Sequence, residues 1–77
     1  MEKRLDEMKE GEKGRIKSIE GSSIKRRLMD MGIIRNSKIE VIRKAPLGDP
    51  IEFSIRGYNL TLRKDEAKDI IVEVEND

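Results

Sequence analysis

The chain has 77 residues, of which 17 are lysine or arginine and 16 are aspartate or glutamate, and it contains neither cysteine nor histidine. This length allows one small domain, residues 1–77, which buries only about 60% of the surface that its unfolded chain exposes. The missing residue types exclude disulfide bonds, thiolate metal sites and a histidine base, so the fold must depend on a small apolar core.

Residues 5–14 predict a lead-in to the fold. Leu5 and Met8 are apolar anchors at helical spacing, so we expect them to reach the core from a turn of helix or an irregular segment. Gly11 and Gly14 follow among charged residues, which favours a polar loop.

Residues 15–20 predict a short strand that ends at Gly21. Ile16 and Ile19 are its apolar side chains. Their spacing does not fit strict alternation, which indicates a β-bulge or a bend between them.

A helix of about eight residues follows in the prediction, capped by Ser22 or Ser23. It ends at Gly32, because glycine readily takes the positive φ that closes many helices. Its buried stripe consists of Ile24, Leu28 and Met31.

The second half of the chain alternates apolar and polar residues, which is typical of strands. Gly57 and Asn59 mark a hairpin turn, and Asp65 is expected to cap one turn of helix. The acidic end of the chain is expected to fray into solvent. The predicted strands cover residues 39–41, 51–55, 58–62 and 70–74.

Several short strands with tight turns predict a mainly β protein. We expect a small, partly open barrel of about five strands, with one short helix and a short helical turn before the last strand. A barrel also limits the unpaired edges that an open sheet of this size would expose. The predicted core contains Leu28, Met31, Ile39, Val41, Ile51, Ile55, Leu60, Leu62 and Val72.

The polar residues do not form a catalytic pattern. Serine hydroxyls have no histidine to activate them, and the chain has no phosphate-binding glycine loop. The carboxylates of Asp65, Glu66 and Asp69 are better explained as charges near a helix N-terminus than as oxygen ligands of a metal ion. We therefore expect no enzyme activity, no cofactor and no dedicated metal site; weak metal binding through carboxylates stays open.

One alternative is a nucleic-acid-binding barrel that uses the basic cluster at Lys25, Arg26 and Arg27. Barrels of this kind usually stack bases on aromatic side chains. Phe53 and Tyr58 are the chain's two aromatic residues, and Phe53 alternates with core isoleucines. Nucleic acid is therefore the less favoured partner.

The alternative that fits better is a protein-binding module. Met29 lies off the buried stripe of the helix and Leu47 lies at a loop tip, so each either contacts a partner or folds back onto the barrel. Basic residues flank the methionine. The predicted contact residues are Arg26, Arg27, Met29, Leu47, Gly48, Asp49 and Pro50.

A family resemblance rests on three segments: RRLMDMGI at 26–33, APLGDPIEFSIRG at 45–57 and LTLRKDEAKDIIV at 60–72. Together with the L-x-x-M-x-x-G lead-in at 5–11, these segments, in this order, resemble the FeoA family. Its members are small cytosolic proteins of bacterial ferrous iron uptake. The resemblance implies an SH3-like barrel and a non-enzymatic role. It also implies contact with the cytosolic GTP-binding part of the membrane ferrous iron transporter FeoB.

The chain departs from the family pattern at Arg35 and Asn36, where the family commonly has Pro-Gly. Asparagine tolerates the left-handed conformation better than most residues, so we expect the turn to be kept. Arg35 adds a charge that could change affinity for a partner.

No apolar run reaches the ~18 residues that cross a bilayer. We expect a cytoplasmic protein without direct membrane insertion. Self-association through an unpaired barrel edge or the Leu47 loop stays open.

Overall fold

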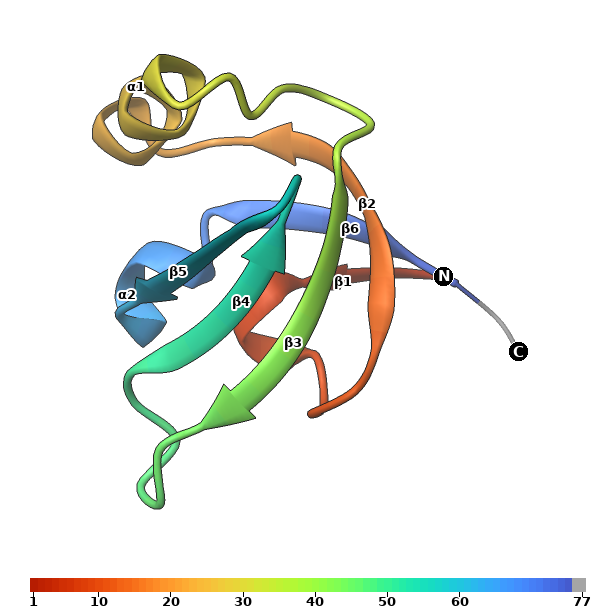
Figure 1. The fold of residues 1–77 in the computed structure, drawn as a ribbon, viewed down its shortest axis with the longest axis vertical. Helices are drawn as coiled ribbons and strands as arrows, with labels where there is room; N and C mark the ends of the chain where they lie inside the picture. Colours follow the sequence, from red (N-terminus) through yellow and green to blue (C-terminus); the bar gives the residue numbers. More distant parts are fainter. Residues whose placement is uncertain (76–77) are drawn as a thin grey trace.

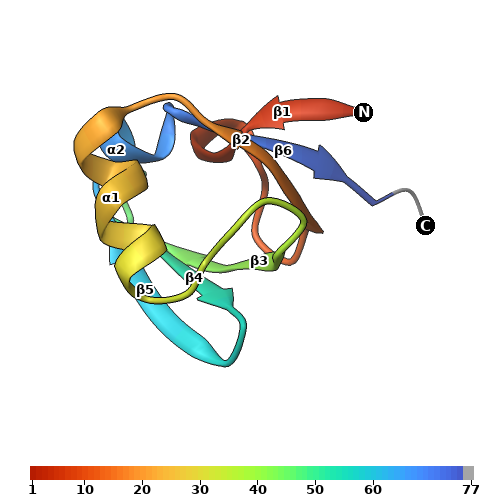
Figure 2. The same cartoon turned by 90° about the horizontal axis from the view of Figure 1, so that it is seen from above.

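The computed structural model describes residues 1–75, which form one bent antiparallel sheet with both α-helices on the same side (Figure 1, Figure 2). The strands are β1 (Glu2–Arg4), β2 (Lys13–Ile19), β3 (Lys38–Lys44), β4 (Ile51–Ile55), β5 (Tyr58–Leu62) and β6 (Ile70–Val74). The helices are the 3₁₀ helix η1 (Leu5–Glu7), α1 (Ser22–Asp30) and α2 (Lys64–Ala67).

The strands follow the order β1-β6-β2-β3-β4-β5, and neighbours pair antiparallel. Within the described residues β1 and β5 are the two ends of this order and do not pair with each other. The mainly β, partly open barrel predicted from the sequence is thus confirmed. The sequence does not predict β1, because its three charged residues show no apolar alternation and become a strand through pairing with β6.

The core lies between the two halves of the bent sheet, beneath α1. Seven of the nine predicted core residues are buried, whereas Met31 and Leu60 only pack against the core from its margin. Ile33 and Phe53 are fully buried as well. The buried apolar residues are Leu5, Met8, Ile16, Ile24, Leu28, Ile33, Ile39, Val41, Ile51, Phe53, Ile55, Leu62, Ala67, Ile70, Val72 and Val74.

The N-terminal lead-in places both of its apolar anchors in the core, as expected. Leu5 and Met8 have no exposed surface, and η1 supplies the helical turn. The assignment of Gly14 to a polar loop is wrong, because Gly14 lies inside β2, buried against β6. Its environment is set by a strand at the other end of the chain, which local composition does not reveal.

The expected irregularity in β2 is present as a register shift between Ile16 and Ser18. The predicted serine cap of α1 is wrong, since Gly21 is the capping residue and no side chain caps it. A Cβ at Gly21 would lie 2.6 Å from Asp69 Oδ2. The close approach of Asp69 thus selects glycine at the start of α1.

The C-terminal end of α1 follows the prediction. Gly32 takes a φ of +80°, and the Ile33 N–H donates to the Leu28 carbonyl over 2.9 Å. Asn36 has a φ of +74°, so the left-handed turn is kept without the family's glycine. Directly after the helix end at Gly32, Ile33 is buried in the core.

Two local predictions in the second half need correction. The hairpin turn lies at Arg56 and Gly57, and Asn59 belongs to β5. Arg63, not Asp65, precedes α2, and the Arg63 N–H donates to Glu66 Oε1 over 2.9 Å. Glu66, the third residue of α2, therefore caps this helix by accepting the backbone N–H of the residue that precedes it.

No helix in residues 1–75 has the length and apolar character needed to cross a membrane. The expected fraying of the acidic end concerns residues 76–77, which lie outside the described part of the chain.

Glu12 ties the lead-in to β1 and gives the fold a pH dependence. Its carboxylate accepts the Lys9 N–H over 2.7 Å and the Lys3 Nζ over 3.1 Å. The Lys9 backbone bond, followed by Lys3, lowers the pKa of Glu12 below its ordinary 4.5. Because the folded pKa is the lower one, this stabilisation is complete above about pH 4.5 and is lost as the pH falls through the folded value.

We expect Glu12→Gln to reduce the loss of unfolding free energy between pH 6 and pH 3, measured by urea denaturation at each pH. The matched control is Asp30→Asn, which changes an exposed carboxylate in α1. An identical pH profile for wild type and Glu12→Gln would contradict the prediction.

Candidate functional site

The surface has a groove of about 320 Å³ between α1 and the C-terminal part of β2. Figure 1 shows β2 running toward the start of α1, while the segment after α1 returns above β2 to enter β3. We call this feature the α1–β2 groove. It is lined by Ile16, Lys17, Ser18, Ile19, Lys25, Met29, Ile33, Ile34 and Arg35.

The groove has an apolar floor and two exposed apolar side chains at its margin. Ile16 and Ile33 are fully buried beneath it. Met29 and Ile34 are 53% and 55% exposed, respectively. Large apolar side chains gathered at one hollow are typical of contact surfaces.

The sequence predicts Met29 at this surface but does not predict Ile34. A usable signal existed, because Ile33 and Ile34 are adjacent in an irregular segment and cannot both enter the core. Once Ile33 is assigned to the core, its neighbour is directed outward.

The rim of the groove is basic. Lys17, Lys25 and Arg35 line it, and no carboxylate does. Lys17 forms an ion pair with Glu2, which raises the pKa of the Lys17 ammonium group. Within residues 1–75, Lys25 and Arg35 form no ion pair, so their charges are available to an anionic partner.

The floor of the groove also includes an open stretch of strand edge. Pairing between β2 and β3 ends at Arg15, and the last backbone contacts are made by Ile16, which exchanges hydrogen bonds with Ser37 (3.0 Å) and Asn36 (2.7 Å). Beyond Ile16, β2 pairs only with β6. Along residues 17–19, the edge of β2 that faces away from β6 therefore has no neighbouring strand within residues 1–75 and borders the groove.

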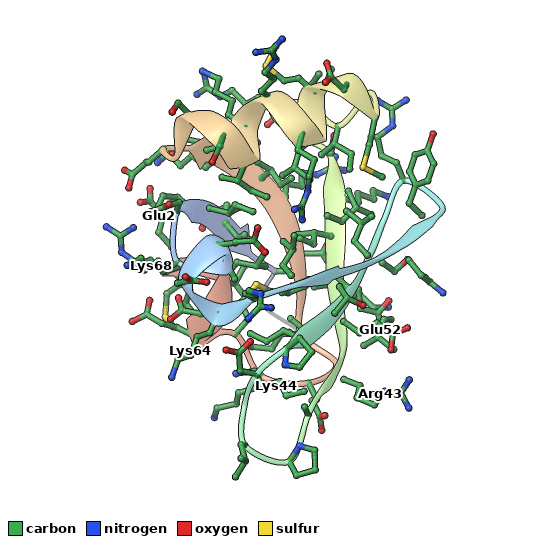
Figure 3. The ribbon with its side chains drawn as sticks, turned by 90° about the vertical axis from the view of Figure 1, so that its left-hand side faces the viewer. Glu2, Arg43, Lys44, Glu52, Lys64 and Lys68 are labelled. Carbon is green, nitrogen blue, oxygen red and sulfur yellow. The ribbon has the colours of Figure 1, made fainter. Side chains whose placement is uncertain are left out.

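The predicted contact residues fall into two groups that the fold separates. Arg26, Arg27 and Met29 lie on α1, whereas residues 47–50 lie in the loop between β3 and β4. Figure 1 and Figure 3 show α1 and this loop at opposite ends of the molecule, with the loop beyond the labelled Arg43 and Lys44. The structure does not bring these groups into one patch.

Within the α1 group, only Met29 lines the groove. Arg26 is exposed and does not line the groove. Arg27 points to α2, where its Nη1 donates to Glu66 Oε2 over 3.2 Å. Arg27 thus links the two α-helices.

The loop group has a structural role as well as an exposed tip. Asp49 Oδ1 accepts the Lys64 N–H over 3.0 Å, which holds the start of α2. Gly48 donates its N–H to the Ala45 carbonyl over 2.7 Å and closes the loop. Leu47 is 95% exposed, so it does not fold back as a plug over the barrel.

The features that a nucleic-acid or metal site needs are weakly represented. Phe53 is buried, which leaves Tyr58 as the exposed aromatic residue. The basic cluster is divided, since Lys25 faces the groove and Arg27 binds Glu66. Among the described residues, no three carboxylates lie close enough together to hold a metal ion.

Comparison with known proteins gives a family match, a curated relative and similar solved structures. Residues 3–74 match the family model of the FeoA domain. The Fe(2+) transport protein A/Fe(2+) transporter FeoB fusion protein of Porphyromonas gingivalis is 36% identical over 72 residues, which are 92% of this chain and 8% of that protein. This chain therefore spans less than a tenth of that curated relative's length.

Two solved structures have the same fold. The NMR structure of an FeoA-like protein from Clostridium acetobutylicum matches with a TM-score of 0.87 and 45% identity, covering 99% of this chain and 90% of that one. Stenotrophomonas maltophilia FeoA complexed with zinc, described as a prokaryotic SH3 domain protein, matches with a TM-score of 0.78 and 24% identity, covering 90% and 87%. The second likeness shows a shared SH3-like fold.

Proposed function

Because residues 3–74 match its domain model, the chain belongs to the FeoA family, and we propose that it is a non-enzymatic accessory protein of bacterial ferrous iron uptake. The family has a role in ferrous iron transport. In this proposal the protein works at the cytoplasmic face of the membrane and binds the cytosolic GTP-binding part of an FeoB-type transporter. The fusion of the two proteins in Porphyromonas gingivalis supports such an association.

The observation that carries the proposal is the α1–β2 groove. Met29 and Ile34 expose apolar surface that a partner can cover, and basic side chains surround it. Interfaces are typically built in this way, with an apolar centre and a polar rim. Of the predicted contact residues, we assign Met29 to this contact.

We expect Met29→Glu to weaken binding of the transporter's cytosolic domain by about 30-fold, measured by isothermal titration calorimetry. A charge placed in the apolar centre is desolvated without a partner, and loss of a central contact typically costs about 2 kcal/mol. Because Met29 is exposed, the fold should persist, and circular dichroism checks this.

Leu47→Glu is the matched control, since Leu47 is also an exposed apolar residue but lies at the other end of the molecule. Its affinity should stay within about twofold of wild type. If Leu47→Glu weakens binding and Met29→Glu does not, the loop is the contact and the groove assignment is wrong. If the wild-type protein does not bind the domain, the proposed function itself is wrong.

A further inference from the structure

The backbone of β2 shows which part of the open edge can accept a partner. The Glu20 N–H donates to the Asp69 carbonyl over 2.7 Å, and Ile19 pairs with Ile70 in the adjacent register position. In an antiparallel ladder, neighbouring residues direct their N–H and C=O groups to opposite sides. The N–H and C=O of Ile19 therefore point away from β6, into the α1–β2 groove.

Ile16 shows what these groups do when a chain lies beside them. The N–H and C=O of Ile16 point to the same side of β2 as those of Ile19. The Ile16 N–H donates to the Ser37 carbonyl, and the Ile16 carbonyl accepts the Asn36 N–H. At Ile19 the segment that contains Asn36 and Ser37 has diverged from β2, and the groove occupies the space between them. An incoming extended chain would repeat the Ile16 arrangement one step further along the strand.

We propose that the α1–β2 groove binds an extended segment of a partner protein that carries alternating apolar and acidic residues. Its backbone pairs with Ile19, its apolar side chains cover Met29 and Ile34, and its carboxylates meet Lys25 and Arg35. This inference rests on the proposed function for the identity of the partner, and it adds the chemistry and the conformation of the bound segment.

Charge complementarity selects the occupant. Among the described residues, two cations without an ion pair, Lys25 and Arg35, line the groove together with the paired Lys17 and no carboxylate, so a basic segment would be repelled and an acidic one attracted. The open edge selects the conformation, because the backbone of a helix is bonded internally and cannot pair with a strand. An extended acidic segment satisfies both conditions.

The direct test is an amide-shift titration of the ¹⁵N-labelled full chain with a synthetic peptide of alternating glutamate and valine, blocked at both ends. We expect shifts centred on Ile19, Met29 and Ile34, with slower hydrogen exchange at the Ile19 amide. The same peptide with lysine in place of glutamate should not bind, and N-methylation of its central amides should weaken binding at least tenfold. Equal shifts from the lysine peptide, or no shift at millimolar glutamate peptide, would overturn the proposal.

Two variants locate the charge effect. Lys25→Glu should weaken binding of the glutamate peptide about tenfold, while Arg26→Glu makes the same charge change at the next residue, outside the groove lining, and should have a much smaller effect. Equal losses would mean that the attraction is not specific to the groove.

The transporter's cytosolic domain separates the two proposals. If it binds and the Ile19 amide is unchanged, strand pairing is wrong and the proposed function stands. If it does not bind, the proposed function is wrong, and the peptide titration still decides the nature of the groove.

Discussion

Replacing Gly14 with alanine should lower the free energy of unfolding by about 3 kcal/mol, at the upper end of the usual range for overpacking. A Cβ at this position would lie 2.4 Å from the Glu73 carbonyl oxygen and 2.6 Å from Val72 Cγ1. The nearer atom belongs to the backbone of β6, so β2 and β6 would have to separate at the centre of the sheet. Small domains have only about 5–15 kcal/mol of total stability, so the effect is large.

Urea denaturation measures this loss, with Gly48→Ala as the control. Gly48 has a φ of +84° and no atom within 4 Å of an added Cβ, so its substitution introduces backbone strain of about 1 kcal/mol without a clash. If the two variants lose the same stability, the close approach of β2 and β6 at Gly14 is not the reason for glycine there.

Phe53→Ala should lower the free energy of unfolding by about 3–5 kcal/mol, because it removes a large side chain from a closed core. Phe53 is fully buried in the middle of β4, where it pairs with Val41 on one side and Leu60 on the other. Few neighbours can move to fill the resulting cavity, since they belong to paired strands.

Tyr58→Ala provides the comparison, because Tyr58 is the other aromatic residue of this hairpin and is 47% exposed. Its substitution should change the stability by about 1 kcal/mol or less. Thermal and urea denaturation measure both variants. A loss below about 1 kcal/mol for Phe53→Ala would mean that the core is far more tolerant than its burial indicates.

The elements that the sequence predicts well are those with a local cause. Residues 51–55 alternate apolar and polar side chains, whereas residues 70–74 are rich in β-branched apolar side chains, and both segments form strands with those limits. The Gly32 helix end and the Asn36 turn are also local, since each depends on the φ of one residue.

The elements that the sequence does not predict depend on distant parts of the chain. β1 exists because β6 lies beside it, and Gly14 and Gly21 are selected by contacts with Glu73 and Asp69. No pattern within a few residues of these positions carries that information.

The candidate site shows the same division. The sequence singles out Met29 and Leu47, because one lies off a helical stripe and the other lies at a loop tip, but it leaves open whether they are exposed, as the structure shows them to be. The separation of Met29 and Leu47 on the surface could not be predicted from the sequence, since it depends on the order of the strands in the sheet. The α1–β2 groove likewise required the structure, because Lys25, Ile19 and Ile34 come from three different segments.

The pairing of β1 with β6 has a consequence for how this domain can be tethered. The Val74 N–H donates to the Met1 carbonyl over 2.9 Å, so the start of β1 and the end of β6 lie together, on the side away from both α-helices (Figure 1, Figure 2). A linker attached at this point leaves the α1–β2 groove uncovered. In a fusion protein, such a tether would hold the groove near its target at an effective concentration of about millimolar, so a weak contact could be mostly occupied without any added interface.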